Sequence, residues 1–361
     1  MFSAVDHDYM ARALQLAERG LLSTTPNPRV GCVLVRDGLV VGEGWHQRAG
    51  ESHAEVHALT AAGELAAGAT AYVTLEPCSH HGRTPPCCEA LLAAGVKRVV
   101  AAMQDPNPMV AGQGIAWLRD AGVDAVCGLM EAEARELNIG FVSRMTRGRP
   151  WLRLKAAASL DGRTALRNGQ SQWITGPDAR LDGHRWRARS CAILTGIGTV
   201  RDDDPQLNVR DLDVSRQPLR VIVDSRLEIS PEARVLQGGR SLVVAAVDNP
   251  LQAHVIEATG AEVICLPNDE GKVDLPAVLR ELAKRGVNEL HVEAGFKLNG
   301  SLLREGLVDE LLLYLAPNII GDAALGLFNL PELESLAEKK RLQWRDVRQV
   351  GTDLRIMARF V

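Results

Sequence analysis

Hydrophobic and polar positions alternate along the first third of the chain in patterns typical of mixed α/β structure. Apolar residues in 9–19 recur at helical spacing, and 54–67 is an alanine-rich run of the same type. Between them, strands are predicted at 30–35 and 40–45, joined at Asp37-Gly38, a strong signal for a β-hairpin. Further strands are predicted at 71–75 and 98–103, and a further helix at 87–94.

The succession of predicted helices and strands is interrupted near residues 146–150, where the chain reads Thr-Arg-Gly-Arg-Pro. We interpret this segment as a linker and expect two domains, residues 1–147 and 148–361. Beyond it, strand-like apolar runs alternate with helical stretches at 277–285 and 298–305, which predicts an α/β domain with a largely parallel sheet. The strand-like runs are 152–157, 192–195, 219–223, 242–247, 262–266, 289–292 and 310–315.

Composition agrees with two ordinary folded domains. The chain has 361 residues, and a prior of roughly one domain per 150 residues gives two. Hydrophobic residues make up 46%, and the net charge of −4 argues against a nucleic acid as the main partner. The sequence shows no membrane-length apolar run and no secretory signal, and its seven cysteines lack the spacing of a disulfide framework. We therefore expect a cytoplasmic enzyme that binds neither nucleic acid nor a membrane.

A zinc site is the strongest chemical signal. His53, Cys78 and Cys87 supply one imidazole and two thiolates, and catalytic zinc sites use three protein ligands with one open position for water. Zinc lowers the pKa of that water, and Glu55 can move the water's proton to leaving ammonia. This arrangement is the signature of zinc deaminases that act on nucleobases, with the glutamate as general acid and base.

The spacing of the cysteines leaves two alternatives open. Zinc deaminases usually carry Pro-Cys-x-x-Cys, whereas an insertion here separates Pro77-Cys78 from Cys87-Cys88. Cys88 could replace Cys87 as the ligand, although Cys87 is nearer to the turn and is preferred. The second alternative is a structural zinc knot, but structural sites usually close with a fourth protein ligand. A helix that begins at these cysteines favours the thiolate form.

Glycines after two predicted strands indicate a nucleotide site in the second half. Thr195-Gly-Ile-Gly-Thr199 follows one strand, and Glu293-Ala-Gly295 ends another before a helix. Such glycines let backbone N–H groups approach a phosphate, yet each also fits an ordinary turn, and the chain has no Gly-x-Gly-x-x-Gly fingerprint. Arg187 and Arg210 are candidates for a substrate phosphate, with solvated surface positions as the alternative.

Longer motifs resemble the RibD family of bifunctional riboflavin biosynthesis proteins, in which a pyrimidine deaminase is fused to a reductase. The resemblance covers essentially the whole chain, and the long cysteine insertion is the form that this family uses. In the first half the motifs are Thr25-Pro-Asn-Pro-Arg-Val-Gly31, Gly50-Glu-Ser-His-Ala-Glu-Val-His57, residues 77–88 and Asp105-Pro-Asn-Pro108. In the second half they are Lys155-Ala-Ala-Ala-Ser-Leu-Asp-Gly162, Ser171-Gln-Trp-Ile-Thr175, Asp202-Asp-Asp-Pro205 and His291-Val-Glu-Ala-Gly295.

The resemblance implies a cytidine-deaminase-like fold for the first domain and a dihydrofolate-reductase-like fold for the second. It also implies two consecutive reactions. In the first, which uses one zinc ion per chain, the amino group at C2 of 2,5-diamino-6-(5-phosphoribosylamino)pyrimidin-4-one is hydrolysed. In the second, NADPH reduces the ribosyl group to give 5-amino-6-(5-phosphoribitylamino)uracil. Family members associate as dimers or tetramers, so a homo-oligomer is expected.

The resemblance also implies roles for individual residues. His53, Cys78 and Cys87 would bind zinc, and Glu55 would be the proton shuttle. Lys155 is a candidate proton donor or phosphate contact of the reductase, although a lysine at a strand end is more often solvated. Positions that match the deaminase substrate pocket are Asn27, His46, Ala54, His80, Arg83, Asp105 and Asn107. Positions that match the reductase substrate site are Ser171, Arg187, Leu207, Arg210 and Glu293. Positions that match its cofactor site are Ala157, Trp173, Thr199, Asp203, Ser225, Gly295, Phe296, Lys297, Leu298, Asn299, Gly300 and Ser301.

Two other functions compete with this one. A deaminase of nucleic-acid bases shares His-x-Glu and Pro-Cys but is usually shorter and basic, so the acidic balance and the second half argue against it. Alternatively, the second half could be a regulatory ligand-binding module without reductase activity. Asp203, Glu293 and the glycines argue against that alternative.

Overall fold

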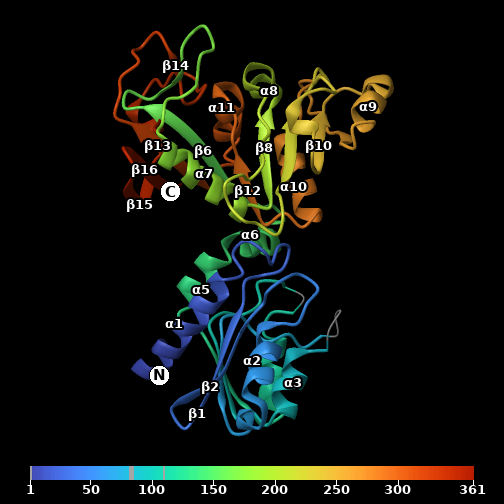
Figure 1. Ribbon diagram of the computed structural model, residues 1–361, viewed down its shortest axis with the longest axis vertical. Helices are drawn as coiled ribbons and strands as arrows, with labels where there is room; N and C mark the ends of the chain where they lie inside the picture. The colour runs from blue at the N-terminus through green and yellow to red at the C-terminus, as the bar shows by residue number, and fades with distance from the viewer. Residues whose placement is uncertain (1, 81–84, 109) are drawn as a thin grey trace. The chain divides into compact units, whose positions relative to one another are not determined.

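The computed structural model describes residues 2–80, 85–108 and 110–361 (Figure 1). The chain forms two compact units, Met1–Arg149 and Pro150–Val361, each with its own sheet and apolar core. Helix α6 (Ile139–Arg147) is followed by Gly148 in the left-handed region (φ 65°), so the expected boundary after residue 147 falls where this helix ends. None of the helices formed by the described residues has both the length and the apolar character that a membrane span requires.

The first unit is built on a five-stranded sheet in the order β2-β1-β3-β4-β5. β1 pairs antiparallel with β2 and β3, whereas β3, β4 and β5 run parallel, so the carboxyl ends of these three strands meet at one edge. The strands are β1 (Gly31–Arg36), β2 (Leu39–Trp45), β3 (Thr70–Val73), β4 (Arg98–Ala101) and β5 (Asp124–Cys127). Besides α6, the helices are α1 (Ala4–Glu18), α2 (Ala54–Ala62), the 3₁₀ turn η1 (Gly63–Ala66), α3 (Cys87–Ala93), α4 (Gln113–Asp120) and α5 (Glu131–Leu137).

Close packing of α2 on the β1–β2 hairpin fixes where the helix starts. A Cβ atom at Gly44 would lie 2.4 Å from the carbonyl oxygen of Ala54, and one at Gly42 would meet α2 equally closely. Glycine on the strand and alanine on the helix therefore let the two backbones touch. Because the approach includes the first residue of α2, it fixes the adjacent His53 and Glu55 over the sheet.

Two expected helix boundaries in this unit are wrong for local reasons. The helix expected at 54–67 ends as an α-helix at Ala62, because Gly63 adopts a positive φ (54°) and the chain continues as η1. The helix expected at 9–19 already begins at Ala4. Ser3 and Asp6 form a capping box there, in which each side chain accepts a hydrogen bond from the other residue's backbone N–H.

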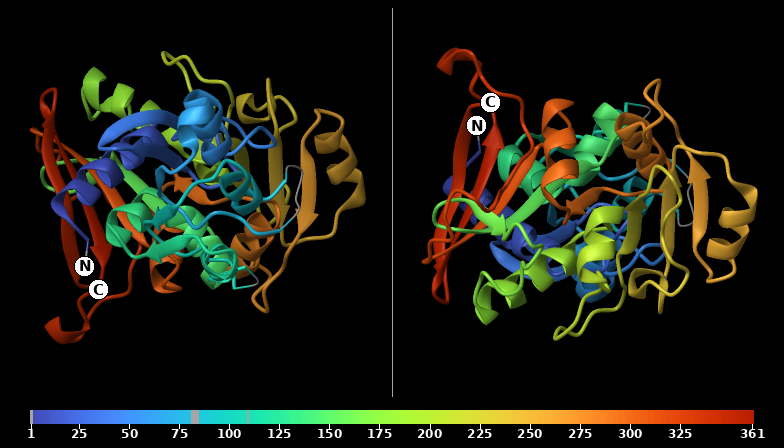
Figure 2. Two further views of the ribbon diagram at one scale, coloured as in Figure 1. Left: turned by 90° about the horizontal axis from the view of Figure 1, so that it is seen from below. Right: turned by 90° about the horizontal axis from the view of Figure 1, so that it is seen from above.

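The second unit is built on a nine-stranded sheet in the order β11-β10-β9-β8-β12-β6-β13-β16-β15. Figure 2 shows this sheet extending from the gold strands at one side to the red strands β16 and β15 at the other. The first seven strands in this order pair in parallel, and β16 pairs antiparallel with both β13 and β15, which confirms the expected α/β domain with a largely parallel sheet.

The strands of this sheet are β6 (Trp151–Ser159), β8 (Ala192–Gly196), β9 (Leu219–Val223), β10 (Ser241–Ala245), β11 (Glu262–Cys265), β12 (Glu289–Val292), β13 (Glu310–Ala316), β15 (Leu342–Val350) and β16 (Asp353–Phe360). A separate pair is formed by β7 (Arg163–Ala165) and β14 (Leu325–Gly326). The helices are α7 (Pro177–Arg189), α8 (Ile197–Asp203), α9 (Pro250–Glu257), α10 (Leu275–Lys284) and α11 (Phe296–Arg304), with 3₁₀ turns η2 (Arg234–Leu236) and η3 (Leu336–Glu338).

Residues of β6 alternate between an apolar and a charged face of the sheet. Leu152 and Leu154 belong to the cluster that also contains buried leucines of α10 and α11. Arg153 and Lys155 point to the other face, which α7 covers. The alternation follows from the two-residue repeat of a strand, and it makes the two faces of this sheet chemically different.

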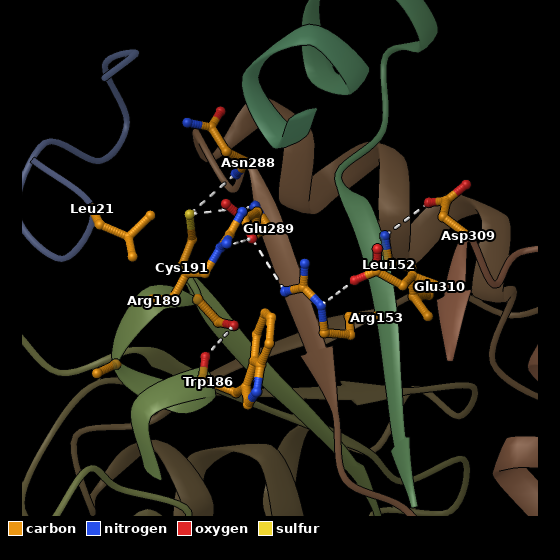
Figure 3. A network of polar contacts seen from close by, with 12 residues as sticks. Leu21, Leu152, Arg153, Trp186, Arg189, Cys191, Asn288, Glu289, Asp309 and Glu310 are labelled. Atoms are coloured by element: carbon orange, nitrogen blue, oxygen red, sulfur yellow. Dashed lines mark hydrogen bonds and ion pairs between the residues drawn. The ribbon is translucent and has the colours of Figure 1, made fainter. Parts of the chain in front are cut away.

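Charged residues hold α7 on its face of the sheet (Figure 3). Arg153 is 2% exposed; its Nε donates to Glu310 Oε1 (2.5 Å), its Nη1 donates to Glu289 Oε2 (3.1 Å), and its guanidinium lies 4.4 Å from the ring centre of Trp186. Arg189 of α7 donates to the same Glu289 oxygen (2.7 Å). Loss of one partner would leave a buried charge unpaired, which is costly, so this layer holds α7 in one position.

Candidate functional site

Three metal-ligating side chains from separate elements meet in the first unit. His53 is the N-cap of α2, Cys78 follows β3, and Cys87 is the first residue of α3. One ligand atom from each lies within 4.8 Å of the other two. His53 Nδ1 is 3.2 Å from Cys87 Sγ and 3.6 Å from Cys78 Sγ, and the Cys87 N–H donates to Cys78 Sγ at 3.3 Å.

Cys88, the alternative ligand, is not part of this cluster. Its buried thiol donates towards the carbonyl oxygens of Pro77 (3.4 Å) and Gly114 (3.6 Å). Burial raises the pKa of Cys88 to about 12, so it stays a neutral thiol that helps to pack α3 against the start of α4. The geometry therefore supports Cys87 as the ligand.

The two clustered cysteines differ in protonation. The Cys87 thiol donates towards Cys78, and together with His53 it lowers the pKa of Cys78 to about 4, while the pKa of Cys87 is raised by the same contact. Cys78 is therefore the more acidic of the two thiols. A bound cation would deprotonate both, because a coordinating thiol is deprotonated outright.

Glu55 lies directly beside the cluster without joining it. Glu55 is 3% exposed, and this burial raises the pKa of its carboxyl group. Among the described residues, its Oε2 has no hydrogen-bond partner. A buried carboxyl oxygen without a partner is costly, so its retention beside one nitrogen and two sulfur donors indicates a role with a bound group. This donor set suits zinc, and three protein ligands leave a coordination position for water.

Two further residues matched by resemblance lie beside His53. His46 and His53 make an edge-to-face ring contact with centroids 5.4 Å apart. His46 Nδ1 is 3.0 Å from the carbonyl oxygen of Ser52 and its Nε2 is 3.1 Å from Asn27 Nδ2, an arrangement in which Nδ1 donates and Nε2 accepts. Burial lowers the pKa of His46, so the ring is neutral at pH 7 and holds Asn27 beside the cluster.

The loop after β4 brings Asp105 to the same side. Asp105 and His80 line one small hollow with Cys78, and His80 itself is exposed. Asp105 Oδ1 accepts a hydrogen bond from the Asn107 N–H (2.8 Å), and burial raises the pKa of Asp105. Arg83 lies outside the described residues.

A second group of charged residues meets at the end of β12 in the second unit. Glu293 accepts two hydrogen bonds from Arg187 of α7, Nε to Oε1 at 2.5 Å and Nη2 to Oε2 at 2.9 Å. Lys155 Nζ lies 3.9 Å from Glu293 Oε2, and His291 Nε2 lies 3.4 Å from Glu293 Oε1. Although burial alone would raise the pKa of Glu293, Arg187 and Lys155 hold it well below its usual range, so the carboxylate is ionised.

Lys155 is not the solvated strand-end residue that its type suggests. It lies in the middle of β6, its side chain is 24% exposed, and burial lowers the pKa of its ammonium group. Its Nζ also lies 6.0 Å from the ring centre of Tyr314, whose hydroxyl donates to Asp182 of α7 (2.6 Å). Asp182 also accepts from Arg355 (2.9 Å). Sequence reasoning missed Asp182 and Tyr314, because these contacts join residues 132 positions apart.

Residues matched to the cofactor gather at the carboxyl ends of the parallel strands. Gly295 is the N-cap of α11, and a Cβ atom there would lie 3.5 Å from Thr199 Oγ1 of α8, so the two residues are adjacent. Asp203, at the end of α8, accepts a hydrogen bond from Ser171 (3.0 Å). Ser225 follows β9 and accepts from the Val273 N–H (3.3 Å). Open parallel sheets bind ligands at this edge.

The other matched positions differ in exposure. Trp173 is 69% exposed with the Arg180 guanidinium over its ring, Ala157 is half-buried in β6, and Leu207 is buried. Gly300 packs on the chain, since a Cβ atom there would lie 2.2 Å from the Asn329 carbonyl oxygen. Within α11, Phe296, Lys297 and Ser301 are partly or wholly exposed, Leu298 packs near Gly196, and buried Asn299 donates to the Ala294 carbonyl. Arg210 is exposed and donates to Gln206 (3.1 Å) and Asn208 (2.8 Å).

Fold and site together define a zinc-dependent deaminase joined to a nucleotide-cofactor reductase. Residues 3–103 match the family described as cytidine and deoxycytidylate deaminase zinc-binding region, and residues 150–356 match the RibD C-terminal domain. The riboflavin biosynthesis protein RibD of Escherichia coli is 52% identical over 361 residues, covering 97% of this chain and 98% of that protein. The chain belongs to the RibD family.

Other relatives and solved structures agree. RibD of Haemophilus influenzae is 48% identical, with 98% of this chain and 97% of that protein covered. A structure of Acinetobacter baumannii RibD has a TM-score of 0.92 and 45% identity and covers 99% of both chains. A diaminohydroxyphosphoribosylaminopyrimidine deaminase/5-amino-6-(5-phosphoribosylamino)uracil reductase from Thermotoga maritima has a TM-score of 0.87 and 32% identity, again over 99% of both chains. The expected family and both expected domain folds are thereby confirmed.

Proposed function

We propose that this chain catalyses two consecutive steps of riboflavin biosynthesis. The first unit deaminates 2,5-diamino-6-(5-phosphoribosylamino)pyrimidin-4-one, and the second reduces the product to 5-amino-6-(5-phosphoribitylamino)uracil with NADPH. The observation that carries the proposal is the cluster of His53, Cys78 and Cys87 beside the buried Glu55, whose Oε2 has no hydrogen-bond partner within the described part of the chain. A separate set of charged residues around Glu293 supports the second activity.

In the deamination, His53, Cys78 and Cys87 would hold zinc, which would lower the pKa of the attacking water and stabilise negative charge. Glu55 accepts the proton of the attacking water at Oε2 and then delivers it to the departing amino nitrogen at C2. One C–O bond forms, one C–N bond breaks, and ammonia leaves. Because Glu55 is buried and its pKa is raised, it can hold the proton between the two steps.

Residues around the cluster orient the pyrimidine. Asn27, fixed by neutral His46, offers an amide to the edge of the ring. Asp105 and Asn107 offer a carboxyl and an amide from the loop after β4, and His80 lies at the exposed side of the hollow. These groups bind and orient the substrate, and buried hydrogen-bonding groups of this kind discriminate strongly against substrates that cannot pair with them.

In the reduction, NADPH supplies a hydride when it is bound. Opening of the ribosyl ring gives a C1′=N imine, and hydride addition at C1′ requires a proton at the nitrogen. Lys155 is the candidate donor of that proton, because burial lowers its pKa and makes its ammonium a stronger acid. Arg187 and Arg210 are the candidates for the substrate phosphate, and Gly295 with Thr199 and Ser225 marks the cofactor side of the sheet edge.

A cytoplasmic homo-oligomer stays part of the proposal. β15 is the last strand of the nine-stranded sheet, and it carries Trp344 (64% exposed) and Val347 (51% exposed). Exposed apolar residues on an edge strand favour association, since an open edge offers unpaired backbone groups to another chain. Light scattering of the purified protein measures the assembly directly.

The proposal is tested by incubating the purified chain with the diaminopyrimidine phosphate, with and without NADPH. Ammonia release without NADPH, and loss of absorbance at 340 nm only when NADPH and the deaminated product are both present, would support it. Ammonia release with no NADPH oxidation under any condition would favour the regulatory-module alternative. Absence of both signals would overturn the proposal as a whole.

A further inference from the structure

Glu76 is a buried carboxylate that gathers four backbone N–H groups. It lies between β3 and Cys78 and is 5% exposed. Oε2 accepts from the N–H of Asp105 (3.0 Å) and of Gly112 (2.9 Å), and Oε1 accepts from the N–H of Gly114 (2.8 Å) and of Ile115 (3.1 Å). A single side chain thus ties together both ends of the segment that runs from the loop after β4 into α4.

This segment carries two of the residues assigned to the substrate. Asp105 is bound directly by Glu76 through its N–H, and its own carboxylate accepts from the Asn107 N–H at 2.8 Å. At the far end of the segment, a Cβ atom at Gly114 would lie 2.0 Å from the Pro77 carbonyl oxygen, so the start of α4 touches the residue after Glu76. Glu76 and Asp105 also line the same hollow as Cys78.

The chemistry of the contact requires a carboxylate. The two oxygens of a carboxylate can accept four N–H bonds. Its negative charge is also favoured at the N-terminus of α4, where the N–H groups of Gly112, Gly114 and Ile115 have no partner within the helix. An amide of the same shape has one oxygen and one NH₂ group, and that NH₂ group would face two N–H donors. Glutamine at this position would therefore lose two hydrogen bonds and would bring its NH₂ group into contact with two backbone N–H groups, which cannot accept a hydrogen bond.

We propose that Glu76 is a positioning residue of the deaminase, which fixes Asp105 and Asn107 relative to the metal ligand Cys78. It acts through these residues and does not itself touch the reacting atoms. The inference rests on the proposed deaminase function and deepens it. The four hydrogen bonds of Glu76 go to backbone N–H groups of the segment that carries Asp105, and none goes to a zinc ligand or to Glu55. Loss of Glu76 should therefore weaken substrate binding more than it slows the chemical step.

The test is the Glu76→Gln variant of the full chain, with Glu64→Gln as a matched control that removes an exposed carboxylate from the same unit. We expect zinc content near that of the wild type, a KM for the diaminopyrimidine raised about tenfold or more, and a smaller change in kcat. NADPH oxidation with the deaminated product should be unchanged, and Glu64→Gln should behave as the wild type. A wild-type KM in Glu76→Gln would overturn the inference.

A second variant separates positioning from folding. Glu76→Asp keeps the charge, but its side chain is one methylene shorter and can accept from only some of the four N–H groups. We expect this variant to bind zinc and to show a KM between those of the wild type and Glu76→Gln. If both variants lose zinc, Glu76 stabilises the unit generally and the inference fails. Wild-type protein that releases no ammonia would instead refute the proposed function, so the two failures are distinguishable.

Discussion

Arg187 and Glu293 are joined by two parallel hydrogen bonds, at 2.5 Å and 2.9 Å, between α7 and the end of β12. Both side chains are largely buried, with 15% and 14% exposed. Lys155 approaches the same carboxylate from β6. Because the Glu293 carboxylate pairs with both cations, it sets the charge of the proposed reductase site and orients the side chains of Arg187 and Lys155.

Glu293→Gln should therefore abolish most of the reductase activity. The change leaves Arg187 and Lys155 without their shared anion and disturbs the orientation of both. We therefore expect kcat/KM for NADPH oxidation to fall by roughly 100-fold or more, a loss of about 2.7 kcal/mol of transition-state stabilisation. Steady-state oxidation of NADPH with the deaminated product is the measurement. Glu257→Gln, on the exposed side of α9, is the control, and ammonia release should be normal in both. Wild-type NADPH oxidation in Glu293→Gln would contradict the assignment.

The ligand assignment predicts opposite results for the two adjacent cysteines. Cys87→Ser should lose zinc and ammonia release, because its Sγ lies 3.2 Å from His53 Nδ1. Cys88→Ser should keep both, because its side chain points to the Pro77 and Gly114 carbonyls, where a hydroxyl can also donate. Metal analysis of the two purified variants decides between them. The reverse pattern would reassign the ligand to Cys88.

Stability of the second unit should fall between pH 7 and pH 5 through His184. Burial, with Arg187 and Arg210 nearby, lowers the pKa of His184 from 6.5 to about 4, and its Nδ1 accepts the Arg210 N–H at 3.2 Å. A depressed pKa means that the unfolded chain binds the proton first, so stability is present above pH 6.5 and is lost as the pH falls towards 4. The loss at pH 5 is roughly 1–2 kcal/mol.

Denaturant unfolding of His184→Gln and of the wild type at both pH values measures this loss. The variant should show a smaller difference between pH 7 and pH 5, because glutamine can accept the same bond without titrating. His254→Gln, an exposed histidine of α9, is the matched control and should behave as the wild type. Equal pH dependence in His184→Gln and wild type would refute the role of His184.

Local sequence predicted much of the fold and the metal cluster, for physical reasons that can be named. His53, Cys78 and Cys87 lie at element ends, where a helix start or a strand end already implies their direction. The strands β15 and β16 and the helices α4 to α6 were not predicted. β15 is mostly exposed, and α5 is a seven-residue helix whose one buried residue is Ala134, so neither carries a strong apolar pattern. Glu76 and Asp182 were missed for a different reason. Their partners are distant in the chain and meet them only in the folded unit.

The two activities should be separable near the expected linker. Each unit has its own sheet and core, so fragments 1–147 and 148–361 should each fold. The first should release ammonia without NADPH, and the second should oxidise NADPH only with the deaminated product. Arg210→Ala in the second should raise the KM for that product by about tenfold or more, if Arg210 binds the phosphate. Insoluble or unfolded fragments, judged by circular dichroism, would contradict independent domains.

The most direct test of two separate sites acting in order is NADPH oxidation by full-length Glu55→Gln supplied with each of two substrates. Glu55 moves protons without binding the metal, so zinc should remain while ammonia release falls about 10²–10⁴-fold. With the diaminopyrimidine phosphate, NADPH oxidation should therefore fall to the same extent. With the deaminated product, it should proceed at the wild-type rate. NADPH oxidation at the wild-type rate from the diaminopyrimidine itself would contradict the account, because the reduction would then not depend on the deamination at Glu55.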